Sequence, residues 1–423
     1  MKKSFMIITA AMVMAFFCMG KENAGASQTA AKAQFTAEKI TAGGVHSLAI
    51  KNDGTLFVTG YNGEGEIGRG GISKIKWLVN MLVWLKSVTH KWSQNMRAAY
   101  DEQDKELEEG TSSMGSVEPN MWGINSSNTF VQVMTGVSQT AAGYYYSAVL
   151  KNDATLWTTG WNNYGQLGNG SKEQGNVFTQ VLAGVSAIAC GGNHTLAIKS
   201  DGSLWAAGNN YDGQLGTGDM VNKFTFMQVM TDVSTASGGW KHTLVLKKDG
   251  TLWATGDNTY GQLGTGDNNS SVKFVQVLSG VAAIAAGDYH SLALKKDGTL
   301  WVTGNNNEGE LGTGDNINKN KFIKVLSGVI SIDAKGLRSF AVVKDGSLLA
   351  AGYNDDGELG TGDHVNRENF VPVLKDVKTV SAGWKHSLAL KKDGTLWGTG
   401  ENYDGQLGVG DNNTRKEWAQ IYQ

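Results

Sequence analysis

The chain has 423 residues, with 37 Lys and Arg against 39 Asp and Glu, and its formal net charge is −2. This balance excludes the strong basic excess of proteins that bind the backbone of DNA or RNA, so we expect no nucleic-acid partner. Two cysteines are too few for a disulfide framework, and the fold must depend on a packed core.

The first residues, MKKSFMIITAAMVMAFFCMG, place two lysines before an apolar run, which is typical of a secretory signal peptide. The small residues Ala24–Ala26 suit a signal peptidase, so we predict a signal peptide over residues 1–26. Cys18 leaves a lipid anchor as an alternative, although Phe16 and Phe17 stand where a lipobox has small residues.

Cleavage at that point would start the mature chain at Ser27. It removes three lysines and one glutamate, which leaves 34 basic and 38 acidic residues, a net charge of −4. Only Cys190 then remains as a thiol. No other apolar run reaches the roughly 18 residues of a membrane span, so we expect a secreted, periplasmic or cell-surface protein without a span, and a monomer.

A sequence motif close to AAGDYHSLALKKDGTLWVTGNNNEGELGTGD repeats along the chain. Its first copy carries Ser47 after the histidine position, and the next copy follows 100 residues later, which is one period of 48 plus an insertion of 52. Seven copies of this size indicate a propeller, a solenoid or an array. The later copies place the same Ser or Thr every 48 residues, at Ser147, Thr195, Thr243, Ser291, Ser339 and Ser387.

Each copy contains four short runs, FVQV, VAAIAAG, HSLALK and TLWVTG, the last two separated by KDG or NDG, a hairpin signal. Four antiparallel strands make one propeller blade. We therefore predict an all-β, seven-bladed β-propeller over residues 27–423. The first copy lacks an FVQV run, which Trp418–Gln423 resembles, so we expect the last strand to complete the first blade and close the ring.

The insertion falls between Gly70 and Phe130, and we place a predominantly helical insertion at residues 71–125 of the first repeat. Its run KIKWLVNMLVWLKSVTHKW is nearly apolar from Trp77 to Leu85, and SQNMRAAYDEQDKELEE could form a polar second arm of a helical hairpin. The apolar run would pack on the propeller. The alternatives are contact of residues 74–91 with a membrane interface or with a partner.

The residues that repeat in every blade are interpreted as architecture. Equivalent positions on separate blades lie on a ring, too far apart to share one ion, so we assign the histidines to structural hydrogen bonds and expect no metal site. The GTGD carboxylates leave calcium as an alternative, with few ligands in each copy. The histidine position holds His46, His194, His242, His290 and His386, with Tyr146 and Arg338 in the other two copies.

No nucleophile motif, phosphate-binding glycine loop or zinc spacing is present, so we expect no enzyme activity and no cofactor. A propeller enzyme would need ionisable groups converging on the central axis. The inward strand positions are mostly Ala, Leu and Ile, which disfavours such a site.

The copies differ in two loops, the pair before the histidine and the segment around a repeated asparagine. If the HSLALK strand runs from one face of the ring, face A, to the KDG turn on the opposite face, then the TLWVTG strand returns to face A. Both variable loops therefore emerge on face A. The loops also hold Val45, Tyr61, Glu64, Asp212, Glu308, Asp356 and Asp404. We predict partner binding at Tyr144, Tyr145, Trp161, Tyr164, Tyr211, Trp240, Lys241, Tyr260, Asp288, Tyr289, Tyr353, Trp384, Lys385 and Tyr403. The alternative is that these rings only pack over neighbouring loops.

The repeat, read as AAGxxHSLALKxDGTLWxTGxNxxGQLGTGD, resembles that of the regulator of chromosome condensation (RCC1-like) family over about residues 40–423. The resemblance implies a seven-bladed propeller. It favours the family's bacterial secreted members, one kind of which inhibits β-lactamase through loops on one face. We thus expect a secreted, non-catalytic scaffold that recognises a protein or glycan. The alternative is nucleotide exchange on a small GTPase, the activity of the family's nuclear eukaryotic founder.

Overall fold

The computed structural model describes residues 35–70 and 126–422. The predicted signal peptide and the predicted helical insertion lie outside the described residues. Within these residues the chain forms strands and turns, without a helix long and apolar enough to span a membrane.

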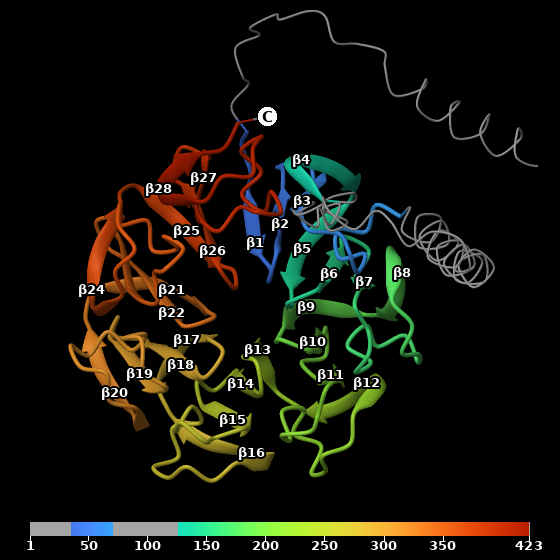
Figure 1. Ribbon diagram of the computed structural model, residues 1–423. Coiled ribbons are helices and arrows are strands. Elements are labelled where there is room, and N and C mark those ends of the chain that lie inside the picture. Colours follow the sequence, from blue (N-terminus) through green and yellow to red (C-terminus); the bar gives the residue numbers. More distant parts are fainter. Residues whose placement is uncertain (1–34, 71–125, 423) are drawn as a thin grey trace, which may run out of the picture. The chain divides into compact units, whose positions relative to one another are not determined.

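The described residues form seven four-stranded antiparallel sheets, set as blades around a ring (Figure 1). This confirms the predicted seven-bladed, all-β propeller. In each sheet the first strand lies near the axis and the fourth at the rim (Figure 1).

The first four blades consist of the following strands: β1 (Lys39–Ala42), β2 (His46–Ile50), β3 (Leu56–Gly60) and β4 (Ser127–Met134); β5 (Val137–Ala142), β6 (Tyr146–Lys151), β7 (Thr155–Gly160) and β8 (Gly175–Ala183); β9 (Val185–Cys190), β10 (His194–Lys199), β11 (Leu204–Gly208) and β12 (Lys223–Met230); β13 (Val233–Gly238), β14 (His242–Lys247), β15 (Leu252–Gly256) and β16 (Ser271–Leu278).

The last three blades consist of these strands: β17 (Val281–Ala286), β18 (His290–Lys295), β19 (Leu300–Gly304) and β20 (Lys319–Leu326); β21 (Val329–Lys335), β22 (Arg338–Val343), β23 (Leu348–Gly352) and β24 (Arg367–Leu374); β25 (Val377–Ala382), β26 (His386–Lys391), β27 (Leu396–Gly400) and β28 (Arg415–Gln420).

Local chemistry forms the hairpin between the second and third strands. In the fourth blade Asp249 Oδ1 accepts hydrogen bonds from Thr251 N at 2.8 Å and Thr251 Oγ1 at 2.7 Å, and Gly250 has φ of 87°. A glycine adopts this left-handed conformation without steric cost. The second blade has Ala154 there, at φ of 63°, so the turn geometry persists even where glycine is absent.

The core lies between neighbouring blades. The second strands are buried along almost their whole length, whereas the rim strands are mostly half-buried or exposed. Leu244 and Leu246 of β14, for example, pack in one cluster with Val281 and Ala293 of the next blade. Each sheet therefore buries its apolar face only when both neighbours are present.

The predicted closure by a shared strand is wrong. β28 pairs with β27 of its own blade, with Trp397 opposite Gln420, and the fourth strand of the first blade is β4, paired with β3. Each FVQV run thus completes the blade that precedes it, so every blade is one contiguous segment of the fold. The insertion consequently lies inside the first blade, between β3 and β4.

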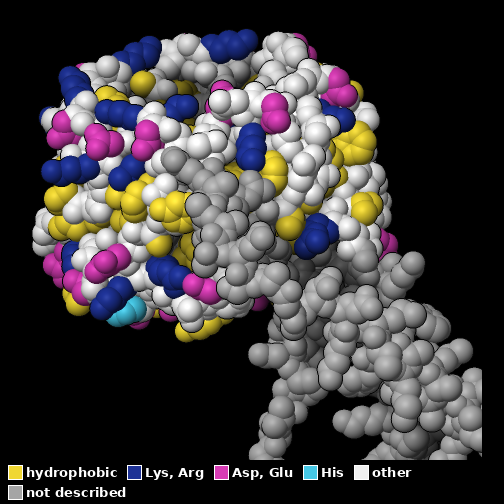
Figure 2. Space-filling model, turned by 90° about the horizontal axis from the view of Figure 1, so that it is seen from above, with side chains coloured by type: hydrophobic (Ala, Val, Ile, Leu, Met, Phe, Trp, Pro, Cys, Tyr) yellow, Lys and Arg dark blue, Asp and Glu magenta, His cyan; other side chains and the backbone are white. Residues whose placement is uncertain are grey.

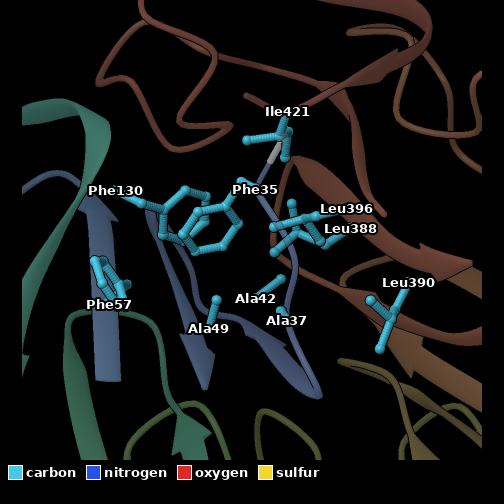
Figure 3. Close-up of a cluster of buried hydrophobic side chains, with 10 residues drawn as sticks. All are labelled: Phe35, Ala37, Ala42, Ala49, Phe57, Phe130, Leu388, Leu390, Leu396 and Ile421. Atoms are coloured by element: carbon cyan, nitrogen blue, oxygen red, sulfur yellow. The ribbon is translucent and has the colours of Figure 1, made fainter. Parts of the chain in front are cut away.

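Side-chain packing closes the ring between the first and last blades (Figure 3). The Phe35 ring stacks on that of Phe130 with centroids 4.8 Å apart. Leu388, Leu396 and Ile421 of the last blade belong to the same cluster. Phe35, in the short segment before β1, therefore packs between the two ends of the ring, and each of the two blades keeps its own four strands.

On the face shown in Figure 2, basic and acidic side chains are interspersed, without a continuous patch of one sign. This distribution agrees with the nearly neutral composition.

Candidate functional site

Strand register confirms that the two variable loops share one face. His242 at the start of β14 pairs with Gly256 at the end of β15, and the other blades repeat this pairing. The pair before the histidine and the loop after the third strand therefore emerge together. We keep the name face A for this side of the ring.

The repeated histidines fasten neighbouring blades together. All five are fully buried, and each Nε2 lies 2.7–2.9 Å from a Ser or Thr hydroxyl of the next blade. The Ser291 hydroxyl donates to Gln262 O at 2.7 Å, so it must accept its second bond from His242 Nε2–H. Burial lowers the pKa of His242 to about 4 and of His290 to about 3, which keeps both neutral. The predicted structural role is confirmed, although the bonds join blades rather than a strand and a loop.

The two substitutions at this position keep a bridge between blades. The Tyr146 hydroxyl donates to His194 O at 2.5 Å. Arg338 is buried, pairs with Glu358 at 3.2 Å and donates to Gly383 O at 2.5 Å in the last blade. The register therefore survives both replacements.

The repeated Asn and Gly shape the loop after the third strand. Asn258 Oδ1 accepts from Leu263 N at 2.9 Å, and its Nδ2 donates to Asp267 O at 3.0 Å. Gly261 has φ of 83°, and a Cβ there would lie 2.5 Å from Asn320 Cα. Asp267 of the GTGD segment accepts from the Thr265 hydroxyl at 2.7 Å. In the described residues no three His, Cys, Asp or Glu side chains come together as metal ligands.

One group of predicted partner-binding residues lies packed near the axis. Tyr144 is only 8% exposed, its ring meets those of Trp240 and Trp384 edge-on at 6.0 and 5.5 Å, and its hydroxyl bonds the Asp288 carboxylate. Asp288 is also buried and accepts from Gly336 N at 3.1 Å. Packing accounts for Tyr144 and Asp288, whereas Trp384 remains 38% exposed.

The two predicted lysines form ion pairs across blade junctions. Lys241 Nζ lies 3.6 Å from Asp212 of the preceding blade, and Lys385 Nζ lies 3.2 Å from Asp356. Lys385 also lies 3.9 Å from Glu401. Each lysine thus meets a carboxylate on the asparagine loop next to it.

A second row of aromatic rings crosses face A from the first blade to the third. The rings meet edge-on in the order Tyr61, Tyr145, Trp161, Tyr164 and Tyr211, with centroids 5.3–6.5 Å apart. Tyr211 at the end of this row is 60% exposed.

Three of these rings line a cavity of about 450 Å³, which we call the aromatic pocket. Tyr145 and Trp161 are predicted site residues, and the other members come from the variable positions of the same loops. The lining residues are Val45, Tyr61, Glu64, Tyr145, Trp161 and Asp404.

The aromatic pocket has acidic side chains in its wall, Glu64 and Asp404. Burial and the neighbouring Glu66 and Glu64 carboxylates raise the pKa of Tyr61. Burial raises the pKa of Asp404, and among the described residues no basic side chain forms an ion pair with it. Glu66 is fully buried behind the pocket, and its Oε2 accepts from Glu64 N at 2.9 Å. Such a surface favours a cationic group over an anion.

Of the remaining predicted residues, Tyr289 extends the group near the axis, because its ring meets that of Trp240 at 5.3 Å. Tyr260 and Tyr289 pack edge-on at 5.3 Å, Tyr353 is half-buried, and Tyr403 is 66% exposed. None of these four lines the aromatic pocket.

Sequence reasoning missed charged groups near the axis. Lys335 Nζ donates to Ala142 O at 2.5 Å, and Asp333 Oδ2 accepts from Ala382 N at 2.7 Å. The segment SIDAKG, which carries charges where the other copies have small residues, was the available signal. Burial raises the pKa of Asp333 to about 6 and of Cys190 to about 11, so this thiol is a poor nucleophile.

Comparisons with known proteins agree with this geometry. A family model described as the RCC1-like domain matches residues 17–324 and 119–422. The yeast RCC1 (Prp20) structure solved with Kap60 shows 21% identity, a TM-score of 0.64 and coverage of 70% of this chain and 79% of that chain. Human WBSCR16 shows 22% identity, a TM-score of 0.65 and coverage of 74% and 88%.

A further structure is that of Prp20p from Saccharomyces cerevisiae, described with its binding properties to Gsp1p and histones. It shows 22% identity, a TM-score of 0.61 and coverage of 68% of this chain and 77% of that chain. Similarity to solved structures at this level of identity establishes the fold. Because the family model spans most of the sequence, this chain belongs to the RCC1-like domain family.

Proposed function

We propose that the chain is a secreted, non-catalytic scaffold that binds a protein partner through face A. The observation that carries this proposal is the aromatic pocket, in which Tyr61, Tyr145 and Trp161 surround a cavity of about 450 Å³ beside two carboxylates. Rigid aromatic rings on a fixed framework give large contact area at low entropic cost.

The state of the ionisable groups supports a role in binding rather than catalysis. The repeated histidines are buried, neutral and bonded between blades. Near the axis, Lys335 and Asp333 bond backbone atoms, and the Cys190 thiol has a raised pKa. These groups hold the ring together through bonds to backbone and hydroxyl atoms of other blades.

The relatives support a protein as the partner. Yeast RCC1 (Prp20) was solved bound to Kap60, and Prp20p is described as binding Gsp1p and histones. A glycan would also stack on tyrosine and tryptophan, and its capture instead of a protein would contradict this part of the proposal.

The first experiment compares the chain with a Tyr145→Ala, Trp161→Ala variant in quantitative pull-downs from the envelope and surroundings of the producing cell. The matched control, Phe224→Ala, Tyr422→Ala, removes two rings that do not line the aromatic pocket. We expect one protein to be retained by the chain and the control and lost by the pocket variant. Equal capture by all three, at equal thermal stability, would place binding elsewhere.

Export is a separate part of the proposal and has its own test. The intact mass of the protein from its natural producer should correspond to a chain that begins at Ser27. Retention of Met1 would contradict export and favour the cytosolic alternative, nucleotide exchange on a small GTPase.

A further inference from the structure

Comparison of equivalent positions in the described part of the repeat shows that the aromatic pocket has a carboxylate but no lysine paired with it. At two blade junctions a carboxylate in the asparagine loop of one blade pairs with a lysine in the following blade: Asp212 with Lys241 and Asp356 with Lys385. Asp404 is the equivalent carboxylate of the last blade, 48 residues after Asp356. The same acid therefore recurs at the junction that closes the ring.

At this junction a valine occupies the position that holds lysine at those two junctions. The position equivalent to Lys241 and Lys385 in the first blade is Val45, and both Val45 and Asp404 line the aromatic pocket. Valine is shorter than lysine and uncharged, so the space taken by a lysine side chain elsewhere is part of the cavity here. Among the described residues, neither a hydrogen bond nor an ion pair reaches the Asp404 carboxylate.

Aromatic rings enclose the vacant lysine position. Tyr61 and Tyr145 meet edge-on at 6.5 Å, and Tyr145 and Trp161 at 6.4 Å, all at the wall of the same cavity. The faces of Tyr and Trp attract cations through their π electrons. Glu64 contributes a second carboxylate to the wall, and Tyr145 stands at the lysine-equivalent position facing it.

We propose that the aromatic pocket binds an alkyl cation, an ammonium or guanidinium group, supplied by a lysine or arginine side chain of the partner. The charged nitrogen would lie at Asp404, as the nitrogens of Lys241 and Lys385 lie at Asp212 and Asp356, and the alkyl stem would lie on Val45. This inference rests on the proposed function and names the group that face A recognises.

The test uses the full chain and three probes: the peptide acetyl-Gly-Lys-Gly-amide, the same peptide with norleucine, which keeps the alkyl stem but lacks the ammonium, and tetramethylammonium. Dissociation constants are measured by saturation-transfer NMR titration. We expect the lysine peptide to bind roughly tenfold more tightly than the norleucine peptide. The difference should shrink between about 20 mM and about 0.5 M salt, because ions screen the exposed charges.

Two variants test the position. Asp404→Asn should remove the preference for lysine, and Val45→Lys should abolish binding, because it supplies an internal ammonium to Asp404. The matched control Asp212→Asn changes an acid that already has Lys241 as its partner and should bind the probes like the unmodified chain. Equal affinity for the lysine and norleucine peptides, an unchanged preference in Asp404→Asn, or no binding of any probe would overturn the proposal.

Tetramethylammonium identifies the source of the cation. If it binds more tightly than the lysine peptide, a free small cation replaces the side chain as the ligand and that part of the proposal fails. A lysine preference without loss of a protein partner in the Tyr145, Trp161 variant supports the cation site and contradicts the proposed function. Loss of the partner in that variant without a preference for the lysine peptide would support the proposed function and contradict the cation site.

Discussion

At the scale of single residues, one repeated position holds Gln in some blades and Glu in others. Burial makes these two side chains chemically different, because only Glu can ionise. Gln262 Nε2 donates to Asp257 Oδ2 at 2.8 Å in its blade. Glu310 occupies the equivalent place, fully buried, and its Oε1 has no hydrogen-bond partner. Burial raises the pKa of Glu310 to about 7.

Replacing Glu310 with Gln should stabilise the fold in a pH-dependent way. Because the folded-state pKa lies above the unfolded value of 4.5, the ionisation of Glu310 lowers the free energy of unfolding as the pH rises from 4.5 through 7. We expect Glu310→Gln to raise that free energy by about 3 kcal/mol at pH 8 and by less than about 1 kcal/mol at pH 5. Urea unfolding at both pH values measures this, with exposed Glu417→Gln as control. An equal effect at both pH values would contradict the assignment.

At the scale of structural elements, adjacent blades are joined by histidines rather than by shared strands. His242 of β14 meets Ser291 of β18 at 2.9 Å, and the Ser291 hydroxyl continues to Gln262 O. Protonation would place a positive charge in the core, so burial keeps the imidazole neutral. The junctions between blades should therefore weaken in acid.

The pH dependence of this junction can be measured with His242→Gln, whose amide can donate to Ser291. The folded-state pKa of His242, about 4, lies below the unfolded value of 6.5, so its contribution is lost as the pH falls from 6.5 towards 4. Between pH 8 and pH 5 the chain should lose about 2 kcal/mol of unfolding free energy that the variant does not lose. Exposed His364→Gln is the control. A constant difference between chain and variant at all pH values would refute a buried neutral His242.

At the scale of the whole molecule, the ring is closed by packing between its first and last blades. Phe35, before the first strand, is 1% exposed and lies in one cluster with Phe130 and with Leu388 of the last blade (Figure 3). Thr36 forms an isolated bridge with Thr395. A few residues before β1 thus carry contacts that hold both ends of the ring.

Phe35→Ala should therefore destabilise the whole propeller. The loss of a fully buried ring typically costs about 3–5 kcal/mol of unfolding free energy. Half-buried Phe224→Ala is the matched control and should cost clearly less. Urea unfolding followed by fluorescence and by limited proteolysis measures both. Similar costs for the two variants would mean that Phe35 does not contribute to closure.

The features that could be predicted from the sequence alone are those that depend on interactions between residues close together in the chain. The period of 48 residues, the four short strands and the KDG turns depend on neighbouring residues, so they could be predicted from the chain alone. The structural role of the histidines followed from their repetition. Turn geometry was also robust, since Ala154 adopts the left-handed conformation that glycine takes in the other blades.

Only the tertiary structure decided features that join distant segments. By its sequence, the last strand could complete either the first blade or its own blade. In the structure β28 pairs with β27 and completes its own blade. The aromatic pocket combines Val45 and Tyr61 of the first blade, Tyr145 and Trp161 of the second and Asp404 of the last. Residues more than 300 positions apart meet there because the ring closes, and no local pattern records that contact.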